Sequence, residues 1–552
     1  MRIKTTLLIV IFISFLNVFS QNPVSYLEKK DKATQLVVEN KPFLMISGEV
    51  HNSSASTISY MKPIFPTLKG MNLNSVFVTL AWEQFEPIEG EYDYTLVDAI
   101  IKNAEENDLK VALLWFASWK NGESSYTPMW VKTDTEHFFR VKTKDGLEIE
   151  TMSPFCEATK KADAKAFKAL MSHLKKADKN GTVILMQPQN EVGMFQDIDY
   201  NEIALELYKK NVPDQLMNYL IKNKESLDDY LNNAWAKSNY KTSGTWKEVF
   251  GDTPESKTFF ITWQYATYIE FVAKSGRDIY DLPMMVNAWI VQKPDDLPGV
   301  YPNGGPVSRV IDIWKAAAPS IDIQSPDIYL PNFKEIVKMY HRKDNPLLIP
   351  ESTSEVGRAY YAFGEHDAIC YSPFGIEDAK NDFLFVKSYE VLNEIEHLIL
   401  KYQGTGKMRA VLKEGDEQAQ DLYMGNYKLK VIYQEPTQPC FGIIIQTAKN
   451  EFLVAGMNLK IHITSEKDGT IGYIGQVFEG GFDKSNNWET SRMLNGDETF
   501  HNARLRVFGR KTITNEKRST IEKKQGEPDA YTPETNQYIT TPGIYKVITY
   551  LR

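Results

Sequence analysis

Short apolar, β-rich blocks alternate with longer amphipathic stretches through about the first four hundred residues of the chain. Such alternation is typical of βα units around a parallel sheet. Eight parallel strands favour a closed barrel over an open sheet, so we predict an α/β fold with a (β/α)8 TIM barrel. The blocks that predict strands are Leu44–Val50, Ser75–Leu80, Lys110–Phe116, Val183–Met186, Pro283–Trp289, Ile321–Ile328, Pro346–Ile349 and Ala368–Tyr371.

Between these blocks, apolar residues recur at helical spacing over Leu96–Glu106 and Lys165–Ala177, and Lys380–Tyr402 predicts a long final helix. One connection is much longer than the others. It runs from Val192 to Leu282, whereas a βα loop usually has about two to six residues. We therefore predict an insertion at about 192–256, which is either a helical excursion or a lid over the mouth of the barrel.

After Tyr402 the pattern changes to short runs of alternating apolar residues separated by Gly, Asp and Asn. This pattern predicts an antiparallel, β-sandwich-like domain. We place the barrel at 24–402 and the C-terminal domain at 403–552.

The N-terminus carries Arg2 and Lys4, then an apolar run from Leu7 to Phe19. This order predicts a cleaved signal peptide over residues 1–20 and a periplasmic or secreted protein. The run is shorter than the roughly 20 residues that span a bilayer, and no later segment reaches that length, so we expect no stable membrane insertion.

Composition narrows the function classes. Hydrophobic residues make up 42% and charged residues 24% of the 552 residues, as in ordinary globular proteins. The net charge of −9 argues against a nucleic-acid partner, which needs a basic face. Aromatic residues reach 12%, and their rings suit the apolar faces of sugars, although core packing is the commoner explanation for any single one. Cys156, Cys370 and Cys440 allow one disulfide bond or three free thiols.

The candidate chemistry lies at the C-terminal ends of the predicted strands, where barrel enzymes carry their working residues. Glu191 follows the fourth strand and Glu351 follows the seventh, so the two should face each other across the barrel. A carboxyl pair about 5 Å apart cleaves a glycosidic bond with retention of configuration, through a covalent glycosyl-enzyme. We assign Glu191 as acid and base and Glu351 as nucleophile, with Asn190 bonding the sugar 2-hydroxyl.

Further polar and aromatic side chains converge on the same mouth, and Tyr329 is a candidate hydrogen-bond donor to Glu351. Glu49 could instead belong to a network of ion pairs. His51 could be a packed residue that forms hydrogen bonds with the side chains that contact the substrate. Trp119 and Trp289 could simply pack on the core. The sequence has no HExxH motif or paired metal-ligand spacing, so we expect no metal and no cofactor. The predicted substrate contacts are Asn190, Glu49, His51, Trp115, Ser118, Trp119, Trp289 and Tyr329.

The motifs SGEVH, WEQFEPIEGEYDY, ASWKNG, PMW and QPQNE resemble those of glycoside hydrolase family 35, the retaining β-galactosidases of clan A. The likeness covers roughly residues 43–377. It implies a carbohydrate substrate, an acid/base role for Glu191 and a nucleophile role for Glu351. The trailing β-domain resembles the DUF5597 group of bacterial proteins, a label that conveys no function.

The chain departs from the family at several motifs. The family's Ala-Glu-Trp, whose Glu contacts galactose hydroxyls, is Ala117-Ser118-Trp119 here, which removes a charge-assisted hydrogen bond of about 1.5–3 kcal/mol. The resulting prediction is a retaining glycoside hydrolase acting on a terminal β-linked sugar, foremost a β-galactoside. The alternatives are an endo-acting clan A glycosidase on plant or algal polysaccharide and a non-catalytic carbohydrate-binding barrel. The sequence does not indicate the sugar, the linkage or the oligomeric state.

Overall fold

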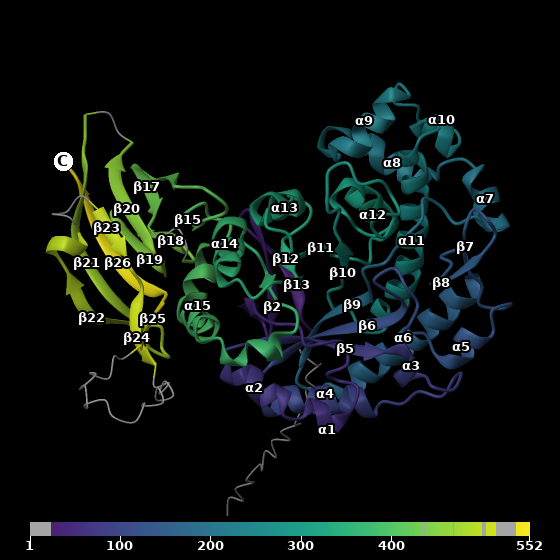
Figure 1. Ribbon diagram of the computed structural model, residues 1–552, viewed down its shortest axis with the longest axis horizontal. Helices are drawn as coiled ribbons and strands as arrows, with labels where there is room; N and C mark the ends of the chain where they lie inside the picture. The colour runs from purple at the N-terminus through teal and green to yellow at the C-terminus, as the bar shows by residue number, and fades with distance from the viewer. Residues whose placement is uncertain (1–23, 435–437, 467–468, 500–503, 515–536) are drawn as a thin grey trace, which may run out of the picture.

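The computed structural model describes residues 24–434, 438–466, 469–499, 504–514 and 537–552 (Figure 1). The predicted signal peptide lies outside these ranges. In the described part of the chain, no helix is both long and apolar enough to cross a membrane. Figure 1 shows a mixed helix and strand region beside a β-rich region, with α14 and α15 between them.

Parallel strand pairs in the first region link into a ring. The sheets β5-β6-β9, β10-β11-β13 and β12-β14-β4 are joined by parallel bridges from Glu49 to Phe77 and from Met186 to Met284. Pro350, which has no N–H to contribute to a ladder, divides the seventh strand into two short segments. All eight predicted strands are present as β4 (Met45–Ile46), β5 (Ser75–Ala81), β6 (Lys110–Lys120), β9 (Val183–Asn190), β10 (Met285–Trp289), β11 (Ile323–Ile328), β12 (Leu348–Ile349) with β13 (Glu351–Ser352), and β14 (Cys370–Tyr371).

The interior of the ring is apolar. Side chains from each ring strand, such as Met45, Phe77 and Ile323, form one buried cluster. Nearly every position of these strands is buried, as expected for parallel strands covered on both faces. The helices that follow the strands in turn are α2 (Ile64–Gly70), α4 (Thr95–Glu106), α6 (Glu157–Ala177), α11 (Pro254–Arg277), α12 (Ile311–Ala317), α13 (Phe333–Tyr340), α14 (Val356–His366) and α15 (Phe383–Tyr402).

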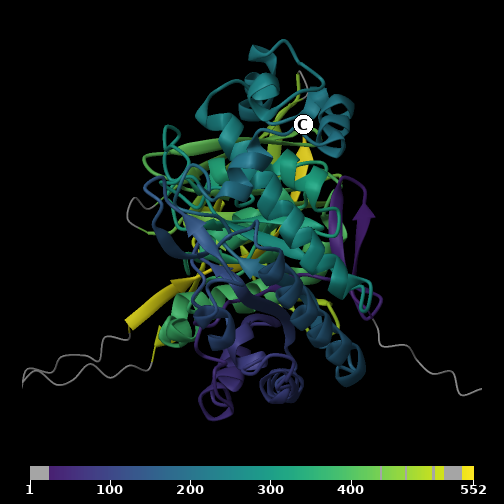
Figure 2. The same ribbon diagram turned by 90° about the vertical axis from the view of Figure 1, so that its right-hand side faces the viewer.

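An N-terminal antiparallel sheet, which the sequence pattern did not predict, adds to the ring. Leu36 and Val38 join the apolar cluster inside the ring, and the Ser25 hydroxyl donates to the carbonyl of Ile184 at 2.6 Å. In Figure 2 this sheet lies, in purple, at one edge of the molecule. Its strands are β1 (Tyr26–Lys30), β2 (Ala33–Val38) and β3 (Lys41–Phe43).

The long connection after β9 is helical, as predicted, and its last helix, α11, packs along α6 as part of the outer layer. The intervening helices stand beyond α11 and α12 in Figure 1. They are α7 (Glu202–Tyr208), α8 (Asp214–Lys222), α9 (Asp229–Lys237) and α10 (Trp246–Phe250). Shorter elements of the first region are α1 (Ile58–Met61), α3 (Trp82–Phe85), α5 (Met129–Thr133), β7 (Arg140–Lys142) and β8 (Glu148–Met152).

The C-terminal region contains two antiparallel sheets whose inner faces share a buried apolar cluster, including Leu429 from one sheet and Val454 and Val547 from the other. Cys156, Cys370 and Cys440 are buried and free, which settles the disulfide question for the fold. The larger sheet comprises β15 (Met408–Leu412), β18 (Phe441–Ala448), β19 (Glu451–Met457), β26 (Gly543–Leu551), β21 (Gly472–Phe482) and β22 (Trp488–Leu494). The smaller sheet comprises β16 (Ala419–Met424), β17 (Tyr427–Tyr433), β20 (Leu459–Ser465) and β23 (Arg504–Val507), while β24 (Arg510–Thr514) pairs with β25 (Gln537–Thr541).

Candidate active site

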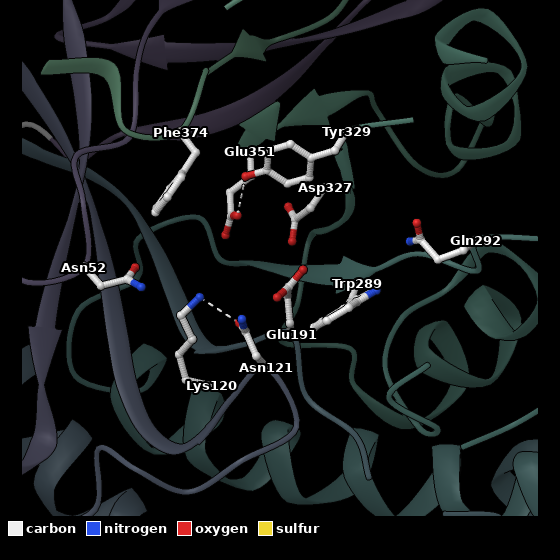
Figure 3. Close-up of a pocket in the computed structure, with 10 residues that line it drawn as sticks. All are labelled: Asn52, Lys120, Asn121, Glu191, Trp289, Gln292, Asp327, Tyr329, Glu351 and Phe374. Atoms are coloured by element: carbon white, nitrogen blue, oxygen red, sulfur yellow. Dashed lines mark hydrogen bonds between the residues drawn. The ribbon is translucent and has the colours of Figure 1, made fainter. Parts of the chain in front are cut away.

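A cavity of about 390 Å³ lies at the C-terminal ends of the ring strands. Glu191 enters it directly after β9, Asp327 from β11 and Glu351 from β13 (Figure 3). The full lining is Asn52, Lys120, Asn121, Glu191, Trp289, Gln292, Asp327, Tyr329, Glu351 and Phe374.

The two glutamates singled out in the sequence meet in this cavity. One carboxyl oxygen from each of Glu191, Asp327 and Glu351 lies within 4.8 Å of the others. Among the described residues, these three carboxyl groups are spaced closely enough to hold a metal ion. Their oxygens would suit a hard cation. The same spacing also suits carboxyl groups that share protons and face one small ligand.

The backbone that presents Glu191 is in an uncommon conformation. Gln189 and Glu191 have φ values of 69° and 42°, a region that non-glycine residues rarely adopt. The amide N–H of Glu191 donates to Asn287 Oδ1 at 2.9 Å, and the Gln189 side chain donates to Asp163 Oδ2 at 2.6 Å. These bonds hold the glutamate at the mouth of the ring.

Side-chain amides connect the carboxyl groups behind the cavity. Asn287 Nδ2 donates to Asp327 Oδ2 at 2.8 Å and to Asn190 Oδ1 at 2.9 Å, and it lies 3.4 Å from Glu351 Oε1. Gln187 Nε2 also donates to Asn190 Oδ1, at 2.9 Å. Asn190 is therefore placed beside the catalytic candidates, but it is buried and its oxygen is already used by two amides.

Burial sets the acidity of Glu191. Burial, and to a lesser extent the nearby Glu351, raise the pKa of this residue to about 7. The hydrogen bond with Asp327 and the positive charge of Lys120 act in the opposite direction. Glu191 is thus suited to carry a proton near neutral pH.

Two neighbours partly offset the effect of burial on Glu351. Burial raises the pKa of Glu351 above its usual range, and Lys120 and a hydrogen bond from Tyr329 lower it by less. The Tyr329 hydroxyl donates to Glu351 Oε2 at 3.0 Å, as the sequence analysis predicted. Burial, with Glu351 nearby, raises the pKa of Tyr329, so the hydroxyl keeps its proton as a donor.

Glu49 adds a fourth carboxyl group close to this set. It is 1% exposed, and burial together with the charge of Glu351 raises its pKa well above the usual range. The side chain lies behind the lining and does not border the cavity itself. The sequence prediction of a direct sugar contact at Glu49 therefore finds no support in this geometry.

The structure places His51 beside a second cavity of about 380 Å³, where its Nε2 lies 2.9 Å from Asp378 Oδ2. Phe374 borders both cavities. Trp289 lines the first cavity, as predicted, and its ring meets the edge of Phe195 with centroids 5.8 Å apart.

Three predicted substrate contacts point elsewhere. Trp115 Nε1 donates to Asp163 Oδ1 at 2.9 Å and the Ser118 hydroxyl to Asp163 Oδ2 at 2.7 Å, which directs both toward α6. Trp119 packs against two tyrosines of α11 and donates to the carbonyl of Met152 at 3.0 Å. Strand β6 continues to Lys120, beyond its predicted end, with a register irregularity between Trp115 and Lys120. The lysine consequently reaches the cavity in place of the three predicted residues.

Several lining residues escaped the sequence analysis. Asp327 stands at the end of the predicted sixth strand, so the rule that selected Glu191 would have found it. Lys120 and Asn121 required the true end of β6, while Gln292 and Phe374 lie outside regular elements where periodicity gives no signal. None of the residues from α7 to α10 borders the cavity, which favours the helical excursion over the lid, the two alternatives that the sequence left open.

Sequence comparison identifies related proteins. Residues 35–261 match the model of glycosyl hydrolases family 35, and residues 385–506 match that of DUF5597, a domain of unknown function. The predicted resemblance to family 35 is confirmed. A β-galactosidase from Xanthomonas manihotis is 27% identical over 173 residues, which cover 30% of this chain and 26% of that protein. The chain therefore aligns with about a quarter of the length of this relative.

Comparison of folds returns glycosidase structures with low sequence identity. A β-galactosidase from Bacillus circulans sp. alkalophilus has a TM-score of 0.44 and 15% identity, with 66% of this chain and 57% of that chain covered. The catalytic domain of a β-amylase from Paenibacillus polymyxa has a TM-score of 0.43 and 12% identity, with 60% of this chain and 92% of that chain covered.

Proposed function

We propose that the chain is a retaining glycoside hydrolase that removes a terminal β-linked sugar, foremost a β-galactoside, and that its ring of parallel strands is a (β/α)8 barrel. The observation that carries this proposal is the approach of Glu191 and Glu351, with Asp327, to within 4.8 Å in one cavity. Carboxyl groups this close favour direct attack, because an inverting pair needs room for a water molecule.

In the first step of the proposed reaction, Glu351 attacks the anomeric carbon while Glu191 gives its proton to the departing glycosidic oxygen. The glycosyl ester that forms removes the negative charge of Glu351. Since that charge helps to raise the pKa of Glu191, the pKa should fall at this stage. Glu191 can then take a proton from water, which attacks the anomeric carbon and releases Glu351 as a carboxylate.

Covalent trapping tests this assignment. A 2-deoxy-2-fluoro-β-galactosyl fluoride should inactivate the enzyme and add one fluorosugar mass to the peptide that contains Glu351. The Glu351→Gln variant should show no such mass and no turnover of chromogenic β-galactoside, β-glucoside, β-mannoside or α-arabinoside. A label on another peptide, or turnover unchanged in Glu351→Gln, would contradict the nucleophile role.

A second candidate is endo-acting cleavage of a polysaccharide. The cavity beside His51, which Phe374 also borders, offers room for another part of a longer chain at the same mouth. Product analysis separates the candidates, because an exo enzyme releases monosaccharide and an endo enzyme releases oligosaccharides. Binding of sugars without turnover of any substrate would instead indicate a carbohydrate-binding barrel.

The N-terminal pattern supports the proposal that the enzyme is periplasmic or secreted. Export should remove residues 1–20, and N-terminal sequencing of protein recovered outside the cytoplasm should then begin at Gln21. Recovery with Met1 intact in the cytoplasm would contradict it.

A further inference from the structure

The carboxyl group of Asp327 is buried, but only one of its two oxygens accepts a hydrogen bond from an amide of the described residues. Asp327 is 3% exposed, yet it borders the cavity. Its Oδ2 accepts a hydrogen bond from Asn287, whereas Oδ1 receives none from the described residues. Figure 3 shows the carboxyl directed into the space between Tyr329 and Glu191.

An oxygen in this position is costly unless something binds to it. A buried polar group without a partner destabilises the fold, and a carboxyl group does so more than a neutral group. Glu191 shares a hydrogen bond with Asp327, but no amide, hydroxyl or ammonium group of the described residues donates to Asp327 Oδ1. The neighbours that could donate are directed elsewhere, since Tyr329 donates to Glu351 and Lys120 donates to Asn121.

Ser118, which the sequence analysis predicted as a substrate contact, does not reach the cavity. It is buried and bonded to Asp163 and Tyr268. Asp327 brings a third carboxyl group into the cavity from a different strand, β11. The acid/base and nucleophile roles leave this group without an assigned partner.

We propose that Asp327 is a specificity-determining residue whose Oδ1 forms a hydrogen bond with one hydroxyl group of the bound sugar. This inference rests on the proposed glycosidase function. The sugar hydroxyl would satisfy an oxygen that the fold leaves unpaired, and a sugar without that hydroxyl would leave it unpaired again. Asp327 would therefore select substrates by the presence of one hydroxyl group beside the scissile bond.

The test is a double-substitution cycle between enzyme and substrate. The value of kcat/KM is measured for wild type, Asp327→Ala and Asp327→Asn on the aryl β-glycoside that the enzyme cleaves best. The same measurement is made on the monodeoxy analogues of that glycoside, and on a matching disaccharide with its own monodeoxy analogues. Asp178→Asn serves as a matched control, because Asp178 is a buried carboxyl group that binds the amides of Thr182 and Val183 before β9, away from the cavity.

We expect Asp327→Ala to lower kcat/KM on the parent glycoside by about 10- to 100-fold, the range expected when the loss of a hydrogen bond leaves a buried polar group without a partner. For one monodeoxy analogue, the kcat/KM of wild type should be lower than on the parent glycoside by the same factor. With Asp327→Ala, parent and analogue should have the same kcat/KM. Asp327→Asn keeps the size of the side chain and should show the same coupling with a smaller loss. Asp178→Asn should leave the ratio of kcat/KM between parent glycoside and analogue unchanged, whatever its effect on the melting temperature.

The outcomes separate this inference from the proposed function. Suppose that wild type cleaves the parent glycoside, and that in every analogue the fold-losses in kcat/KM from Asp327→Ala and from the missing hydroxyl simply multiply. The role of Asp327 is then overturned, while the proposed glycosidase function stands. If wild type cleaves no glycoside at all, the proposed function falls, and this inference falls with it.

Discussion

The mouth of the strand ring and the interior of the C-terminal sandwich are both buried, but they bury opposite kinds of side chain. At the mouth, Glu49, Glu191, Asp327 and Glu351 are each less than one-tenth exposed. Between the C-terminal sheets, the cluster that includes Leu429 and Val454 is made of apolar and aromatic residues and one cysteine. Apolar burial stabilises a fold, whereas buried acids reduce its stability. The buried acids at the mouth therefore indicate a functional site, whereas the apolar interior of the sandwich is a core that stabilises the fold.

Glu191→Gln should produce the largest effect, because it removes the proton donor at the mouth. General acid catalysis contributes about 10²- to 10⁴-fold, so kcat on a disaccharide should fall by that factor. The leaving group of a dinitrophenyl glycoside departs without protonation, so formation of the glycosyl-enzyme from this substrate should be slowed much less. Equal losses on both substrates would contradict the acid role, and Glu489→Gln on exposed β22 serves as the control.

Phe452→Ala tests the other side of the comparison. Phe452 is 2% exposed in the sandwich interior, and its ring meets Tyr427 with centroids 5.4 Å apart. Removing a buried phenyl ring should lower the free energy of unfolding by about 3–5 kcal/mol in urea denaturation. Tyr423→Ala, on a 55% exposed residue of the same region, should change it by about 0.5 kcal/mol or less. Similar losses for both would show that the interior is poorly packed.

The acids at the mouth should make stability depend on pH. Folding raises the pKa of Glu191 to about 7, so the folded protein holds this proton more tightly than the unfolded chain does. The resulting stabilisation is complete below about pH 4 and is lost as the pH rises through about 7. We expect the melting temperature to fall between pH 5 and pH 8, and to fall less steeply in Glu191→Gln. A slope that is the same in Glu191→Gln and in Glu489→Gln would refute this.

Trp119→Phe should have the smallest effect and distinguishes a structural residue from a sugar contact. The substitution removes the hydrogen bond from Nε1 to the carbonyl of Met152 and should lower the free energy of unfolding by about 1 kcal/mol. The KM should stay unchanged, because the indole lies among α11 side chains outside the cavity. A severalfold rise in KM with normal stability would restore the sequence prediction of a substrate contact.

The sequence revealed the periodic parts of this molecule well. Buried parallel strands are nearly continuous apolar runs, so all eight could be located, and counting them placed Glu191 and Glu351 at the same mouth. The N-terminal hairpin was missed because its first strand, Tyr26–Lys30, is largely exposed and polar. The side chains at the end of β6 were misassigned because a local irregularity in register changes which residues reach the cavity, and pattern alone does not show it.

Helix α14, which begins four residues after Ser352, connects the two regions physically. Gly357 and Gly364 lie so close to β15 and β18 that an added methyl group would meet Leu412, Phe441, Ala410 or Ile443 at 3.0 Å or less. Apolar residues of these strands also belong to the same buried cluster as the helices around the ring. Truncation at residue 402 would therefore expose to solvent the apolar face that α14 packs against β15 and β18. We expect the shortened chain to aggregate, which would make the region after residue 402 a structural support of the strand ring.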